Sequence, residues 1–116
     1  MIDTAAMTDK ADHPMPLDLA ELASARQRIG QSVTRTPMVP SEFLSLAVGA
    51  QVHLKLENLQ RTGSFKLRGA TNRIARLLEY GDRPAGVIAA SAGNHAQGVA
   101  QAARQAGLRA VVVMPS

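Results

Sequence analysis

Lys66 is the residue of this sequence best placed for covalent chemistry. It is one of three lysines in the chain and lies in the first turn of a helix that Gly63-Ser64 is predicted to open after a polar turn over residues 58–63. A helix N-terminus carries partial positive charge, which disfavours a cation there. With partial burial, we expect a lowered lysine pKa and a larger fraction of neutral, nucleophilic amine, as Schiff-base formation with an aldehyde requires. An exposed lysine whose stem lies along the surface would explain the same residue.

A second candidate site is the turn that follows the apolar run 86–90. Its sequence is Ser91-Ala92-Gly93-Asn94-His95, and a helix is predicted to begin within it. Successive backbone N–H groups at such a turn point into open space and favour an anion. Glycine permits close approach of a ligand to the backbone. A carboxylate and a phosphate fit equally well, and an ordinary connection between strand and helix would give the same pattern.

Other kinds of site have less support. His95 can serve as an acid or base, although a histidine at a helix start is more often a polar cap. No second histidine or carboxylate stands at metal-ligand spacing, and the chain has no cysteine, so we predict no metal site. Neither the dinucleotide fingerprint nor the Walker pattern of glycines is present.

The elements before residue 51 are predicted to be mainly helical. Asp18 and Glu21 form a capping-box pattern for a helix that ends at Gly30. After an extended segment around Pro37, a short helix over residues 42–48 follows, capped by Ser41 and ended by Gly49.

From residue 51 the pattern predicts alternating strands and helices. The elements are a strand over 52–56, a helix between Gly63 and Gly81, a strand over 86–90, a helix over 93–105 and a strand over 109–114. Connections of this length favour parallel strands joined by right-handed crossovers. The continuous apolar runs of the last two strands favour burial on both faces. Ligands of such sheets bind at the carboxyl ends of the strands, so we expect both candidate turns there.

Periodicity also predicts which side chains face the core. On the first helix they are Leu19, Leu22, Ala23, Arg26 and Ile29. On the second long helix they are Leu67, Ala70, Thr71, Ile74, Leu77 and Leu78. On the third they are Ala96, Val99, Ala100, Ala103 and Ala106. Val52, Leu54 and Leu56 alternate with His53, Lys55 and Glu57, and we assign His53 and Lys55 to the wetter face of this strand.

Composition restricts the class of protein. The length fits one small domain or part of a larger one, with a core of aliphatic residues. The net charge is +4, but the arginines are scattered without interleaved aromatics, which argues against nucleic-acid binding. No apolar run approaches the length of a membrane span, and residues 1–16 read as a disordered leader without a secretory signal. The absence of cysteine suits a cytoplasmic protein.

Two long motifs carry a specific resemblance. Residues 54–70, Leu-Lys-Leu-Glu-Asn-Leu-Gln-Arg-Thr-Gly-Ser-Phe-Lys-Leu-Arg-Gly-Ala, resemble the cofactor-lysine segment of threonine dehydratase (threonine ammonia-lyase). Residues 91–100 resemble a second signature of these enzymes, and Thr36-Pro37 also matches their pattern. The resemblance covers about residue 18 to the end. It implies the two-domain, pyridoxal-phosphate fold type II, which serine racemase and tryptophan synthase β share.

The resemblance also implies a role for each matching residue. Lys66 would bind pyridoxal phosphate as a Schiff base and later remove the substrate Cα proton. Phe65 would lie against the cofactor, Asn94 would hydrogen-bond its 3′-oxygen, and Ser64 would lie near its phosphate as a possible proton donor. Residues 91–95 would hold the substrate carboxylate. The reaction would convert threonine or serine to a 2-oxo acid and ammonia.

The resemblance further implies that part of the enzyme is missing from these 116 residues. The family's glycine-rich phosphate loop and the residue facing the pyridine nitrogen lie beyond the region matched. Residues 17–50 would belong to the large domain, and 51–116 would be an incomplete small domain carrying the lysine. We therefore expect an N-terminal fragment that is inactive alone, from an enzyme whose full-length form is a homo-oligomer.

Two alternatives stay open from the sequence. Serine racemase carries the same motifs and is the nearest competitor within the class. A non-catalytic α/β module that binds a small anion or a partner chain through the same turns is the alternative from another class. The sequence does not distinguish threonine from serine, nor a biosynthetic from a catabolic enzyme.

Overall fold

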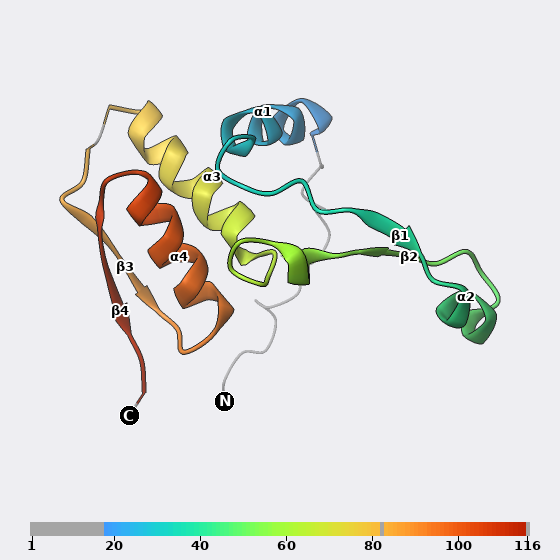
Figure 1. The fold of residues 1–116 in the computed structure, drawn as a ribbon. Coiled ribbons are helices and arrows are strands. Elements are labelled where there is room, and N and C mark those ends of the chain that lie inside the picture. Colours follow the sequence, from blue (N-terminus) through green and yellow to red (C-terminus); the bar gives the residue numbers. More distant parts are fainter. Residues whose placement is uncertain (1–17, 82, 116) are drawn as a thin grey trace, which may run out of the picture.

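The computed structural model describes residues 18–81 and 83–115; the leader predicted for residues 1–16 lies outside them. Figure 1 shows a body of helices and strands from which a slender arm projects. The element order is α1 (Leu19–Ile29), β1 (Met38–Pro40), α2 (Glu42–Val48), β2 (His53–Lys55), a 3-10 turn η1 (Glu57–Leu59), α3 (Lys66–Glu79), β3 (Gly86–Ala90), α4 (Asn94–Gln105) and β4 (Arg109–Val113).

The short helix α2 shows why the local signals predicted its bounds correctly. Ser41 is in an extended conformation, and its hydroxyl accepts a hydrogen bond from the Leu44 N–H at 3.4 Å. Gly49 ends the helix with φ of 69°, a left-handed conformation that glycine adopts without the cost a Cβ imposes. At α1 the cap is also present, but the Asp18 carboxylate accepts from Ala20 N–H at 2.8 Å, one residue earlier than a capping box requires.

The body is a stack in which α1 packs on α3, α3 on α4, and α4 on the sheet of β3 and β4. The buried side chains are aliphatic and small, and Leu67 on α3 is completely buried. The core consists of Ile29, Val33, Leu67, Ala70, Ile74, Ala89, Val99, Ala102 and Ala103. Arg28 links α1 to α3. Its guanidinium donates to the side chains of Glu79 at 2.8 Å and Asn72 at 2.7 Å, both on α3.

The predicted order of strands is confirmed only in its second half. β3 and β4 pair in parallel, with Gly86 opposite Arg109 and Ala90 opposite Val113, and α4 forms their crossover. β2 does not join this sheet; it pairs antiparallel with β1 in a separate two-stranded sheet. The reason is local: β1 and β2 flank α2, so a short connection brings them together. The helix α3, which connects β2 to β3 in the chain, packs on α4 and not on the sheet of β3 and β4. It therefore does not form a crossover that places β2 beside β3.

The expectation that β3 and β4 are buried on both faces was wrong. Ile88 on β3 is 78% exposed and Val113 on β4 is 57% exposed. The helix α4 covers the opposite face, where Ala89 is buried. An unalternating apolar run shows that both faces tolerate apolar residues, but it does not show which elements cover them.

The predicted core face is confirmed for α3 but was partly wrong for the other two long helices. On α1, Leu22 is half exposed, while Arg28 is largely covered through its contact with α3. On α4, Ala100 is exposed, whereas Gly98 and Ala102 are buried. In an alanine-rich helix several faces are apolar, so hydrophobic spacing does not select the packed face.

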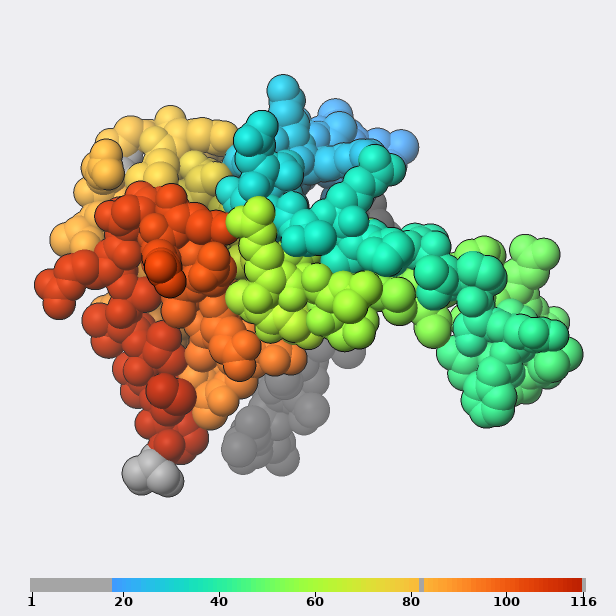
Figure 2. All heavy atoms as spheres, in the orientation of Figure 1, coloured from blue at the N-terminus to red at the C-terminus, as the bar shows by residue number. Residues whose placement is uncertain are grey.

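An arm formed by β1, α2 and β2 (residues 38–55) stands clear of the body, as Figures 1 and 2 show. Two large apolar side chains of α2, Phe43 and Leu46, are each 79% exposed. Within the described residues, no helix combines the length and the apolar character that crossing a bilayer requires.

Candidate functional site

Lys66 lies in the first turn of α3, as the sequence predicted, although the helix begins at Lys66 itself and not at Gly63-Ser64. Its side chain is exposed. The Nζ atom lies 5.3 Å from the centre of the Phe65 ring. Phe65 is itself 61% exposed, so an amine and an aromatic face are presented together at this helix end. The first turn of α3 contains no acidic residue that would offset the cation. The lysine therefore lies at the electrostatically unfavourable helix N-terminus that the sequence predicted, but the expected partial burial was wrong.

Close packing of α4 fixes the backbone of Lys66. A Cβ atom added at Gly98 would lie 3.0 Å from the Lys66 carbonyl carbon and 3.2 Å from the Leu67 nitrogen. The two helices therefore approach as closely as their backbones permit. They run in the same general direction, so that both N-termini lie at one end of the pair (Figure 1). This packing, rather than a shared sheet, brings the Lys66 turn and the turn over residues 91–93 to the same end.

The loop before α3 contains buried hydroxyl groups without hydrogen-bond partners. Gly63 has φ of 67°, and its N–H donates to the Gln60 carbonyl at 2.8 Å, closing a tight turn. Ser64 is 7% exposed, and neither its Oγ nor the Thr62 Oγ1 has a partner among the described residues. A buried hydroxyl left unpaired is costly, so these atoms are candidates for binding a ligand.

The turn after β3 is tied to the sheet and opens outward. The Ser91 N–H donates to the Val113 carbonyl at 3.0 Å, and the Gly93 N–H donates to Ser91 Oγ at 3.2 Å. No side chain of the described residues caps α4, so its first N–H groups are available to an anion. Asn94 and His95 open the helix with exposed side chains, and Ala92 and Gly93 are exposed as well.

His95 faces a groove between α3 and β3. The groove has a volume of about 540 Å³ and also includes Gly69, Arg73, Val87 and Ala89. Its walls are mainly apolar, and Arg73 is the charged residue among those that line it. Among the described residues, no group of three or more histidine or acidic side chains could hold a metal ion.

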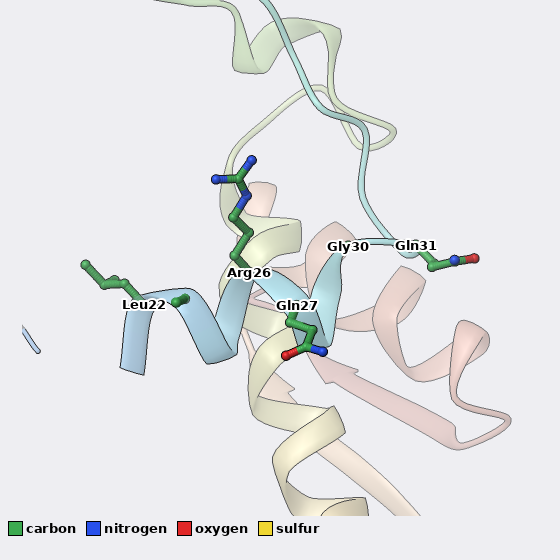
Figure 3. A pocket seen from close by; sticks show the side chains of 6 residues that line it. Leu22, Arg26, Gln27, Gly30 and Gln31 are labelled. Atoms are coloured by element: carbon green, nitrogen blue, oxygen red, sulfur yellow. The ribbon is translucent and has the colours of Figure 1, made fainter. Parts of the chain in front are cut away.

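The hollow on the outer side of α1 contains none of the predicted site residues. It is lined by Leu22, Ala23, Arg26, Gln27, Gly30 and Gln31. Figure 3 shows that the side chains of Arg26 and Gln27 diverge from the helix instead of converging on a common point. A site for a small ligand needs converging polar groups, so we assign this hollow no function.

Sequence reasoning missed a polar cluster beside Lys66. The Glu57 carboxylate accepts from Arg68 Nε at 2.9 Å and from Arg68 Nη2 at 2.6 Å, and it also accepts from the Thr36 hydroxyl. These hydrogen bonds, chiefly that of Arg68, lower the pKa of Glu57 to about 2. A signal was available: Arg68 is a second cation in the first turn of α3, where a cation needs an acidic partner. Glu57 itself lies in η1, after the end of β2.

The chain matches one family. Residues 29–116 match the family described as pyridoxal-phosphate dependent enzyme. This match covers most of the chain, so the chain belongs to that family.

Three relatives illustrate the likeness. An L-threonine ammonia-lyase of Thermotoga maritima is 50% identical over 85% of this chain and 24% of its own length. The structure of a T.th. threonine deaminase is 46% identical with a TM-score of 0.73, over 84% of this chain and 34% of that one. Maize serine racemase is 39% identical with a TM-score of 0.75, over 84% and 30%. The chain thus spans about a quarter to a third of the length of these relatives.

The residues present fit pyridoxal phosphate in part. An exposed amine that can react with the cofactor aldehyde, an aromatic ring beside that amine and an unpaired buried hydroxyl at Ser64 lie within three consecutive residues. Asn94 opens the neighbouring helix with an exposed amide. The described residues therefore include an amine that would react with the cofactor aldehyde, two groups that would contact its ring and a hydroxyl that would face its phosphate.

Proposed function

We propose that this chain is the lysine-bearing part of an enzyme that eliminates water from L-threonine or L-serine and releases a 2-oxo acid and ammonia. The single observation that carries the proposal is the juxtaposition at one end of α3 and α4. There the packing of Gly98 on Lys66 places an exposed amine next to an uncapped helix start. An enzyme that uses an aldehyde cofactor on an amino acid requires an amine to bind the cofactor aldehyde. It also requires an anion site to bind the substrate carboxylate. The L-threonine ammonia-lyase and threonine deaminase relatives support the substrate class.

Each residue of the site has its own role in this proposal. Lys66 holds the cofactor covalently and, once the substrate amine has displaced it, accepts the proton from substrate Cα. Pyridoxal phosphate, when bound, supplies an electron sink for the resulting carbanion. Phe65 and Asn94 position the cofactor ring, and the buried Ser64 hydroxyl interacts with its phosphate or donates a proton. The backbone N–H groups of residues 91–95, with the Ser91 side chain, bind the substrate carboxylate.

Trapping the cofactor on the chain tests the proposal without an activity assay. The protein is incubated with pyridoxal phosphate and reduced with borohydride, and the modified lysines are identified by peptide mass spectrometry. The chain has three lysines, so the distribution among Lys10, Lys55 and Lys66 is a direct measure of selectivity. We expect the adduct to concentrate on Lys66, because its amine is exposed beside an aromatic ring at a helix N-terminus.

The matched variants are Lys66→Arg and Lys55→Arg. Lys55 is also exposed, but its Nζ donates to the Thr36 carbonyl at 2.5 Å. Lys66→Arg is expected to remove most of the adduct, and Lys55→Arg is expected to leave it nearly unchanged. Equal labelling of the three lysines would contradict the proposal.

A racemase is the second candidate function, favoured by the match to maize serine racemase. The two reactions share removal of the Cα proton and differ in the step after it. In the longest form of the protein that its gene encodes, the elimination reaction predicts ammonia and pyruvate from L-serine, whereas racemisation predicts D-serine. If Lys66 binds the cofactor neither in the 116-residue chain nor in that longest form, a non-catalytic anion-binding module is favoured instead.

The domain division is part of the same proposal. We propose that residues 17–50 belong to the large domain of the full enzyme and that residues 51–116 belong to its small domain. The exposed apolar residues of the arm, such as Phe43 and Leu46, support a contact with sequence beyond the present chain. A cytoplasmic, homo-oligomeric full-length enzyme completes the proposal, supported by the cysteine-free composition and the exposed apolar surface.

A further inference from the structure

We propose that the ion pair between Glu57 and Arg68 positions Lys66 for its reaction with the cofactor. This inference rests on the proposed function and assigns a positioning role to two residues outside the predicted set of site residues. The pair joins η1 to the first turn of α3, and the segment between its two members contains Thr62, Ser64 and Lys66.

The geometry of the pair is bidentate. Arg68 Nε donates to Glu57 Oε2 at 2.9 Å, and Arg68 Nη2 donates to Oε1 at 2.6 Å. The two side chains are 30% and 16% exposed, so solvent only partly screens the pair. A planar guanidinium with two bonds to one carboxylate fixes orientation as well as distance, which a lysine ammonium does not.

A third segment holds the pair in place. The Thr36 hydroxyl donates to Glu57 Oε1, and Arg68 Nη2 donates to the Thr34 carbonyl at 3.1 Å. Beside it, the Gln60 side chain forms two hydrogen bonds with the Thr34 backbone, accepting at 2.8 Å and donating at 2.9 Å. The chain around residues 34–36 thus supports both ends of the loop that leads to Lys66.

The position of Arg68 links this cluster to the lysine. Arg68 lies two residues after Lys66 in the same helical turn. The backbone N–H of Arg68 donates to the Phe65 carbonyl at 3.0 Å. Any rotation or fraying of this turn would therefore move the Lys66 amine relative to α4. Glu57 also supplies, from outside the helix, the negative charge that the first turn of α3 lacks.

Selectivity of cofactor trapping tests the inference. In Glu57→Gln we expect the ratio of adduct on Lys66 to adduct on Lys55 to fall by about threefold or more, because small displacements of a reacting group are costly. Arg68→Lys keeps the charge but loses the bidentate geometry, so its ratio should lie between those of Glu57→Gln and the unaltered chain. Circular dichroism of each variant verifies that α3 is still formed.

The matched control is Glu79→Gln, which removes the other ion pair found among the described residues, at the opposite end of α3. We expect it to destabilise the packing of α1 without changing the lysine ratio. If Glu57→Gln and Glu79→Gln both leave the ratio unchanged, the pair is merely structural and the inference is wrong.

A charge exchange separates positioning from loss of folding. The double variant Glu57→Arg, Arg68→Glu restores an ion pair with its members reversed. Recovery of the ratio relative to Glu57→Gln supports the inference, even if the single variant is poorly folded. A ratio as low as that of Glu57→Gln in a folded double variant overturns it. An unaltered chain that shows no preference for Lys66 overturns the proposed function itself, and the inference with it.

Discussion

At Gly98 the absence of a side chain determines how closely α4 approaches the first turn of α3. The neighbouring atoms are backbone atoms of Lys66 and Leu67, which a small rotamer change cannot move. Gly69 provides the contrast, because it lies inside α3 with no atom within 4 Å of an added Cβ. The two glycines occur in the two motifs that the sequence singled out, yet only one of them is required by packing.

The pair of substitutions Gly98→Ala and Gly69→Ala tests this difference. Alanine inside a helix is favoured over glycine by about 1 kcal/mol, so Gly69→Ala should stabilise the protein by about that amount. At Gly98 the same gain is offset by overpacking of about 1–3 kcal/mol. In urea unfolding, the free energy of unfolding of Gly98→Ala should therefore be about 2 kcal/mol lower than that of Gly69→Ala. Equal stabilisation of both would show that the helices are not in backbone contact.

At the scale of elements, the link between η1 and α3 depends on the charge of Glu57. Arg68 approaches the carboxylate from α3, the Thr36 hydroxyl approaches it from the segment before β1, and Gln60 lies beside it. Together they lower the pKa of Glu57 from 4.5 to about 2, although partial burial opposes the shift. A carboxylate whose pKa is lowered by folding stabilises the folded state when it is ionised.

The sign and the pH range of this effect are set by the two pKa values. The stabilisation by Glu57 is fully present above pH 4.5, the unfolded pKa, and is lost as the pH falls through about 2. At 1.36 kcal/mol for each unit, the pH-dependent part is about 3 kcal/mol. Unfolding measured from pH 6 to pH 2 should show the unaltered chain losing this much more free energy of unfolding than Glu57→Gln. Parallel pH curves for the two proteins would contradict the assigned pairing.

At the scale of the whole molecule, the described residues form a layered stack with one open side. The helix α4 covers one face of the sheet of β3 and β4, and the other face presents Ile88, Val111 and Val113. The arm over residues 38–55 exposes further apolar residues away from the body. Such surface is more than an isolated small domain ordinarily exposes, which agrees with a chain spanning about a quarter to a third of its relatives' length.

Two isoleucines, one in the core and one on the uncovered face of the sheet, test whether that face is open. Ile74 on α3 is 6% exposed, whereas Ile88 on β3 is 78% exposed. Because loss of the buried methylene and burial of an unpaired hydroxyl both cost free energy, Ile74→Thr should destabilise the protein by about 2 kcal/mol or more. The same substitution at Ile88 should change the free energy of unfolding by less than about 0.5 kcal/mol. Comparable losses at both positions in thermal unfolding would show that the open face is covered.

The sequence by itself determined the local features and the family. The bounds of α2 and β3, and the buried face of α3, followed from caps, glycines and periodicity, because these signals act between residues close in sequence. The two motifs indicated the family for the same reason, since each is a continuous stretch. The roles of Lys66, Ser64, Phe65, Asn94 and the turn over residues 91–95 remain predictions.

Only the tertiary structure decided which elements meet. Nothing in the alternation of residues 52–56 shows that β2 pairs with β1 instead of β3, and nothing in an alanine-rich helix shows that Gly98 faces Lys66. Glu57 and Arg68 are eleven residues apart on different elements, and each alone reads as a surface charge. Such contacts depend on backbone geometry and on long-range packing, which hydrophobic spacing does not encode. Lys66 could therefore be selected from the sequence, whereas its surroundings could be described only from the fold.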